Sequence, residues 1–172
     1  LIMKQIWDFS QTVDIDDVKE ILDRQIACNM AIANEGIHNS YGANIGHVIL
    51  NMDSDCVKTK AKAYAAAGSD ARMNGCELPV VINSGSGNQG ITCCVPVVVY
   101  AKELNCTNEQ LYRALVLSNL TAIYIKTGIG TLSAFCGAVS AGAAAGAGIA
   151  YLHDGTYEEI QHTIVNALAI LS

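Results

Sequence analysis

Residues Thr127–Leu152 read TGIGTLSAFCGAVSAGAAAGAGIAYL, a stretch without a charged side chain in which glycine, alanine, serine and threonine predominate. It is longer than the roughly 20 residues that a helix needs to cross a bilayer. However, it has few large apolar side chains, so its transfer into lipid is unfavourable. Small residues four positions apart, as at Gly142, Gly146 and Ala150, let helix backbones approach closely. The stretch therefore predicts a buried central helix rather than a membrane span.

Two capping boxes flank this stretch. Residues 107–110 read TNEQ and precede apolar residues at helical spacing, with Gly128 as the expected stop. Residues 156–159 read TYEE and open a second apolar run of the same period. Together with the small-residue helix between them, they predict a mostly α-helical bundle with a buried Gly/Ala-rich central helix.

The first half of the chain also shows helical patterns. Asp14 or Asp16 can cap a helix whose apolar positions recur at helical spacing, and Gly36 is a plausible stop. We expect a further helix over residues 53–67, capped within Asp53–Asp55, and then a turn over residues 69–75. The turn-like residues 39–46, NSYGANIG, separate the two helices.

Residues 91–104 leave two possibilities open. They are apolar and β-branched, which is typical of a buried strand, and they contain Pro96. They could equally form a helix with this proline near its first turn, because periodicity does not distinguish a short buried strand from a buried helix.

Composition restricts the class of protein. The 172 residues are 51% hydrophobic, enough for one ordinary domain spanning residues 1–172. The formal charge is −6 and lysine and arginine are scattered, so we expect no nucleic-acid partner. Only 15% of residues are charged, so we expect further buried surface and a homo-oligomer. The apolar ends, Leu-Ile-Met and Ala-Ile-Leu-Ser, suggest an internal piece of a longer protein.

The seven cysteines form neither a C-x-x-C pair nor a regular framework. An odd count in a chain without a signal peptide indicates reduced thiols, and hence a cytoplasmic location. Cys93 and Cys94 are adjacent, and we expect at least one of them to lie in the core.

The most distinctive chemical feature is the segment 75–90, GCELPVVINSGSGNQG. Its glycines permit positive φ and close approach of a ligand, and successive backbone N–H groups can form a nest for an anion. Apolar runs on both sides favour a fixed ligand loop over a flexible surface loop. The pattern matches neither common nucleotide motif. The expected ligand is a small anion such as a substrate carboxylate. The candidate substrate-binding residues are Asn83, Ser84, Gly85, Ser86, Gly87, Asn88 and Gln89.

Two further residues could act beside this loop. Cys136 stands at the front of the Gly/Ala helix, where a helix N-terminus favours a nucleophilic or metal-binding thiolate, although small buried cysteines are common in cores. Lys126 could either complement the helix dipole at the surface or reach a substrate carboxylate. The four histidines lack i+3 or i+4 histidine partners, yet His38 or His47 could serve as a base.

Three runs carry a family resemblance: KAYAAAGSDARMNGCELPVVINSGSGNQGI (residues 62–91), KTGIGTLSAFCGAVSAGAAAGAGIAYL (residues 126–152) and HTIVNALAILS (residues 162–172). They resemble the alpha-type domain of iron–sulfur-dependent L-serine dehydratases, and more closely the relatives described as L-cysteine desulfidases. The resemblance implies a mostly helical domain and a [4Fe–4S] cluster held by three cysteines. It places the first ligand on Cys136 and the other two just after Ser172.

The resemblance also implies a reaction, the α,β-elimination of a small amino-acid substrate to pyruvate and ammonia. A cluster with three cysteine ligands leaves one iron open as a Lewis acid for the leaving thiolate or hydroxyl. The glycine loop would hold the α-carboxylate. Candidate catalytic bases are Cys76, Lys126 or a residue outside these 172. L-Cysteine and L-serine both remain possible substrates.

Two alternatives compete with this interpretation. Serine- and glycine-rich loops also hold substrate in pyridoxal-phosphate dehydratases, where Lys60 or Lys62 could form the Schiff base, but that fold needs alternating strands and helices. The chain could also be a non-catalytic helical module that binds an amino acid.

Overall fold

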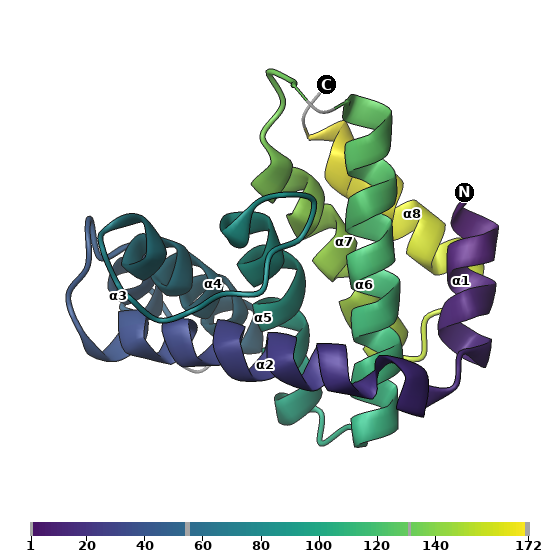
Figure 1. Ribbon diagram of the computed structural model, residues 1–172, viewed down its shortest axis with the longest axis horizontal. Coiled ribbons are helices and arrows are strands. Elements are labelled where there is room, and N and C mark those ends of the chain that lie inside the picture. The colour runs from purple at the N-terminus through teal and green to yellow at the C-terminus, as the bar shows by residue number, and fades with distance from the viewer. Residues whose placement is uncertain (1, 54–55, 131, 171–172) are drawn as a thin grey trace.

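The computed structural model describes residues 2–53, 56–130 and 132–170, and within these ranges it contains helices and no strand. The mostly α-helical prediction is therefore confirmed. The helices are α1 (Met3–Thr12), α2 (Ile15–His38), α3 (Ile45–Leu50), α4 (Val57–Met73), α5 (Gly87–Glu103), α6 (Asn108–Ile129), α7 (Gly137–Leu152) and α8 (Tyr157–Ala169), as Figure 1 shows.

Helix α7 is the predicted central helix of the bundle, packed against α5, α6 and α8. Its small residues permit close approach: a Cβ added at Gly148 would lie 2.9 Å from the carbonyl oxygen of Ala114 on α6. Ala141 and Ala144 are fully buried with Cys93 of α5. The buried Gly/Ala helix is thus confirmed, and among the described residues no helix is both long and apolar enough to cross a membrane.

The ambiguous residues after the glycine loop belong to helix α5, which also includes the last part of the predicted loop, Gly87–Gly90. It begins at Gly87 with Ser86 as N-cap, so Pro96 lies in its middle rather than in its first turn. Ile91 and Val95 pack against α2 and α4, while Val97 packs against α6 and α7. Because α5 is buried on several sides, tertiary packing overrides the strand preference of its β-branched residues.

Helix α2 runs past Gly36, and the prediction of a stop there was wrong. A Cβ at Gly36 would lie 2.1 Å from the carbonyl oxygen of Ala67, so this glycine lets α2 and α4 touch. Of the two predicted N-cap candidates, Asp14 is the cap, since its side chain accepts a hydrogen bond from the Asp16 N–H at 3.1 Å. Close helix crossing, rather than helix termination, explains Gly36.

Three boundaries also differ from the predictions. Helix α4 continues to Met73, so the turn expected over residues 69–75 is confined to its end. The N-cap of α4 is Cys56 rather than Asp53, and Asp55 lies outside the described residues. Helix α6 passes Gly128 and ends at Ile129, with Gly130 as the C-cap residue, whose φ of 92° suits glycine. Both predicted capping boxes, at Thr107 and Thr156, are present.

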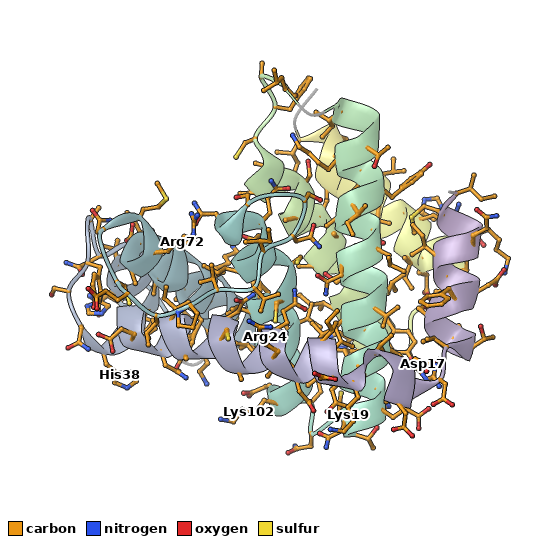
Figure 2. The ribbon with its side chains drawn as sticks, viewed as in Figure 1. Asp17, Lys19, Arg24, His38, Arg72 and Lys102 are labelled. Carbon is orange, nitrogen blue, oxygen red and sulfur yellow. The ribbon has the colours of Figure 1, made fainter. Side chains whose placement is uncertain are left out.

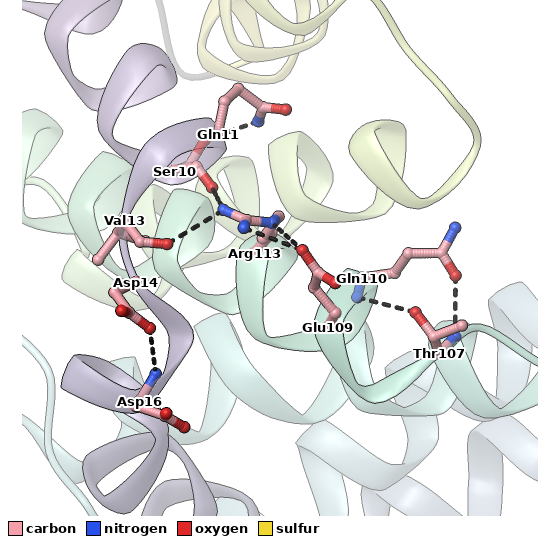
Figure 3. A network of polar contacts seen from close by, with 9 residues as sticks. All are labelled: Ser10, Gln11, Val13, Asp14, Asp16, Thr107, Glu109, Gln110 and Arg113. Carbon is pink, nitrogen blue, oxygen red and sulfur yellow. Dashed lines mark hydrogen bonds and ion pairs between the residues drawn. The ribbon is translucent and has the colours of Figure 1, made fainter.

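The end of α1 is tied to α6 by a polar network around Arg113 (Figure 3). The guanidinium donates to the carbonyl oxygens of Ser10 at 3.0 Å and Val13 at 3.4 Å, and it pairs with Glu109 at 2.9 Å. These bonds satisfy carbonyl groups that the end of α1 leaves without helical partners.

Candidate functional site

The glycine loop contains a tight two-residue turn. The backbones of Asn83 and Ser86 exchange hydrogen bonds of 3.1 and 3.0 Å, and the two residues between them have positive φ, 50° at Ser84 and 82° at Gly85. This is the dihedral pattern of a type I′ turn. The Ser84 hydroxyl donates to the Asn83 side-chain oxygen at 2.8 Å, which steadies a conformation that serine rarely adopts.

Behind the turn lies a cluster of side-chain amides. Asn83 donates to the Asn119 side-chain oxygen at 3.0 Å, and Asn119 and Gln25 exchange two hydrogen bonds of 2.8 Å. Asn29 pairs with both backbone groups of Val81, at 2.8 and 3.1 Å. The side chains of α2 and α6 therefore fix the loop, as predicted, in place of a flexible surface loop. Its role in ligand binding stays a prediction.

The buried amides of Gln25 and Asn29 were not predicted from the sequence, although their positions in the apolar pattern of helix α2 indicate burial. Gln25 and Asn29 stand on the same helical stripe as Leu22 and Ile32, at positions where an apolar side chain is expected. Both are buried, with 3% and 0% of their surfaces exposed. A polar residue on an apolar stripe calls for a hydrogen-bond partner.

The start of α5 is covered by Arg72, which sequence analysis also missed. A Cβ at Gly87 would lie 2.2 Å from the Arg72 Nε atom, so the guanidinium stem rests on the first residue of the helix. Arg72 also donates from Nη1 to the Asn88 side-chain oxygen at 3.2 Å, and Figure 2 shows it beside the start of α5. Free N–H groups and a cation together favour an anion at this end of the helix.

The first turn of α5 meets the first turn of α7 (Figure 1). A Cβ at Gly137 would lie 2.5 Å from both the Cδ and Nε2 atoms of Gln89, so the amide of Gln89 lies directly against the first residue of α7. The structure thereby brings two helix N-termini together, one from the glycine loop and one that follows Cys136.

Two polar side chains at this junction make no hydrogen bond to the described residues, and the hydroxyl of one of them, Ser140, is fully buried. Gln89 is 7% exposed, and its side-chain amide makes no hydrogen bond there. Ser140 is 1% exposed, lies on the same side of α7 as Gly137, and its hydroxyl has no partner. An unsatisfied buried polar group costs about 1–3 kcal/mol, so the Ser140 hydroxyl suggests that a ligand completes the site, with the Gln89 amide available beside it.

Cys136 is the N-cap residue of α7, at the front of the Gly/Ala helix as predicted. Its thiol is free and exposed, so it is not the small buried core cysteine that was the alternative. Within the described ranges, no group of three or more histidine, cysteine, aspartate or glutamate side chains could hold a metal ion. The described residues therefore fit one cluster ligand at Cys136 and do not fit a complete [4Fe–4S] site.

The other cysteines differ from Cys136 in burial. Cys93 and Cys94 are both fully buried, so the prediction of a core cysteine in this pair is confirmed. Burial raises the pKa of the Cys93 thiol to about 12 and raises that of Cys94 as well. These two thiols stay protonated and act as small apolar groups.

Lys126 lies in the last turn of α6 and shares a cavity with the glycine loop. The cavity, of about 350 Å³, is lined by Ser84, Ile123, Lys126, Thr127 and Gly130. Neither Lys126 nor Arg72 forms an ion pair with an acidic side chain in the part of the chain described. Both cations are therefore free to bind a ligand, and the catalytic role of Lys126 stays a prediction.

Cys76, the other candidate base, lies at the opposite end of the loop segment and does not line this cavity. It packs against the core formed by α2, α4 and α5, close to Tyr41. A hydrogen bond from Tyr41 to Glu35 at 2.9 Å, burial and Cys76 together raise the pKa of Tyr41 to about 12. The role of Cys76 stays a prediction.

The candidate histidine bases lie on helices that do not carry the loop. His38, at the end of α2, has its Nδ1 atom 2.7 Å from the carbonyl oxygen of Asn34. His47 lies on α3, and its Nε2 atom is buried without a partner in the described residues.

Comparison with known proteins identifies the family. The family profile described as "Serine dehydratase alpha chain" matches residues 3–172. A UPF0597 protein of Desulfitobacterium hafniense is 61% identical over the whole chain, which covers 40% of that relative. UPF0597 proteins of Lachnoclostridium phytofermentans and Phocaeicola vulgatus are 57% and 42% identical over 100% and 99% of the chain, which covers 41% of each. No solved structure matches. The chain spans about two fifths of the length of these relatives, and it belongs to the serine dehydratase alpha-chain family.

Proposed function

We propose that this chain forms the substrate-binding part of an iron–sulfur-dependent amino-acid lyase, with L-cysteine as substrate and L-serine as the alternative. One observation carries the proposal: the amide of Gln89 lies against Gly137, and this close contact between the glycine loop and the Cys136 end of α7 supports a single shared site. Family membership supports a lyase, and the names of the relatives state no substrate.

The α-carboxylate of the substrate would bind at the start of α5. The first N–H groups of α5 and the Arg72 guanidinium supply positive charge there, and Gln89 and Ser140 supply unpaired polar groups. Holding the carboxylate fixes the orientation of the Cα–H bond relative to the base. Lys126, which lines the cavity beside Ser84, is our first candidate for that base, and Cys76 is the second.

The proposed reaction is an α,β-elimination followed by hydrolysis of the imine that it produces. The base takes the α-proton, the Cβ–S bond breaks with its electron pair on sulfur, and aminoacrylate remains. Aminoacrylate tautomerises to the imine, and water converts the imine to pyruvate and ammonia. For L-cysteine the products are pyruvate, ammonia and hydrogen sulfide; for L-serine, water leaves in place of sulfide.

A [4Fe–4S] cluster would supply Lewis acidity at the leaving group. We propose Cys136 as one of its ligands, because this thiol is exposed and stands at the junction of α5 and α7. The remaining ligands would come from outside these 172 residues. A cytoplasmic location would keep the cluster and the seven free cysteines reduced.

The test uses full-length protein prepared and reconstituted without oxygen. We expect pyruvate and ammonia from L-cysteine or L-serine, with sulfide from L-cysteine. Iron and acid-labile sulfide per chain should fall in Cys136→Ser and remain at the parent level in Cys28→Ser, a half-buried cysteine on α2. Unchanged iron in Cys136→Ser would refute the ligand assignment.

Absence of product from both amino acids, with binding still detected by calorimetry, would favour a non-catalytic amino-acid-binding module. The pyridoxal-phosphate alternative gains no support, because the described chain lacks the alternating strands and helices of that fold. Lys60 and Lys62 lie on α4, and neither lines the cavity beside Ser84.

A further inference from the structure

An apolar groove of about 380 Å³ lies between α1, α2, α6 and the segment that leads into the turn. Four large apolar side chains on its walls remain widely exposed: Phe9 at 46%, Ile21 at 71%, Ile82 at 58% and Ile123 at 42%. They come from α1, α2, the loop segment and α6, so four separate parts of the chain contribute to one apolar surface. Such contiguous exposed patches commonly mark interaction sites.

The groove offers an occupant apolar contacts and no charge. None of its lining residues is charged. The polar groups in its floor, Gln25, Asn83 and Asn119, already bond to one another. A polar ligand would therefore find few free partners, whereas an apolar segment would cover the exposed isoleucines without leaving a buried charge.

The lengths of the relatives indicate where such a segment comes from. The match covers the whole of this chain but only 40% and 41% of two relatives, so about 60% of each relative's chain accompanies the matched unit. A second copy of the chain is a poorer occupant. Asp17 is exposed on α2 one turn before Ile21, and a two-fold contact through the groove would bring the two Asp17 carboxylates near one another.

We propose that an apolar segment from the additional chain of the longer protein packs into this groove. Asn83 and Ser84 line the groove and also belong to the turn, so the docked segment covers one side of the glycine loop. The proposal is independent of the reaction, because it requires only the apolar surface and the extra chain.

The test measures thiol labelling in the full-length protein. Ile21→Cys and Ile82→Cys place probes in the groove, and Glu20→Cys is a matched control that is exposed on another face of α2. Maleimide incorporation is followed peptide by peptide by mass spectrometry, which separates the probes from the native cysteines. We expect both groove probes to react about tenfold or more slowly than the control, independently of protein concentration.

Two results would overturn the proposal. Labelling of both groove probes at the rate of Glu20→Cys would show that nothing covers the groove. Protection that disappears on dilution would identify a second copy as the occupant. Ile21 is 71% exposed in these 172 residues, so its replacement by cysteine leaves their core intact. Ile82→Cys repeats the measurement on the opposite wall.

Discussion

Asn119→Ala should destabilise the protein strongly, because Asn119 joins α2, α6 and the glycine loop. Its side-chain oxygen accepts from Gln25 and Asn83, and its NH₂ group donates to Gln25 and to the carbonyl oxygen of Leu115. Gln25 is 3% exposed, so water does not readily replace the lost bonds. The substitution removes both hydrogen bonds that Gln25 makes with Asn119.

The magnitude follows from the groups left without partners. Each buried polar group that loses its hydrogen bond costs about 1–3 kcal/mol. Two such groups remain on Gln25, and because they are neighbours their costs are not fully additive. We expect a total loss of about 2–4 kcal/mol from the free energy of unfolding, a large part of the about 5–15 kcal/mol typical of a domain.

Urea unfolding of the full-length protein, followed by circular dichroism, measures this loss. With an ordinary m-value, the midpoint of Asn119→Ala should fall by about 1–2 M. Asn166→Ala is the matched control, since Asn166 is exposed on α8, and its midpoint should not move. If the two variants unfold at the same urea concentration, the amide cluster does not hold the loop and our reasoning is refuted.

Two further predictions concern packing and pH. Gly90→Ala should cost about 1–3 kcal/mol, because its Cβ would lie 2.0 Å from the carbonyl oxygen of Val81. Gly142→Ala should be neutral or stabilise by up to about 1 kcal/mol, since the nearest atom is 3.9 Å away; thermal melts that show equal effects would contradict this contrast. Hydrogen bonds from the backbone and side chain of Thr156 lower the pKa of Glu159 from its ordinary value of 4.5. The folded pKa is the lower one, so this contribution is present above pH 4.5 and is lost as the pH falls through the folded pKa. The stability difference between the parent and Glu159→Gln should therefore shrink below that pH, and a difference that grows on acidification would contradict the assignment.

The parts of the fold that depend on neighbouring residues could be predicted from sequence. Both capping boxes, at Thr107 and Thr156, form as expected because a cap and its partner lie three residues apart. The buried Gly/Ala helix was predictable because its composition suits neither solvent nor lipid. The position of Cys136 at its front follows from the same pattern.

The parts that depend on distant residues could not. Gly36 has the local signature of a helix stop, and the contact with Ala67 that explains it lies 31 positions away. The contact between Arg72 and the start of α5 could not be predicted from the residues around Arg72. It depends on how the loop between α4 and α5 folds back and brings the two helices together. Asn119 is an amide on a largely apolar helix, and its partners come from α2 and the turn. Tertiary packing, rather than propensity, assembles the candidate site.

The central claim is that the junction of α5 and α7 binds substrate, and Gln89→Met tests it most directly. Gln89 makes no side-chain hydrogen bond to the described residues, so methionine of similar shape should leave the unfolding midpoint unchanged or higher. If the amide binds the substrate carboxylate, its loss should lower kcat/KM for L-cysteine or L-serine by about tenfold or more. An unchanged kcat/KM together with a lowered unfolding midpoint would make Gln89 a packing residue and contradict our account.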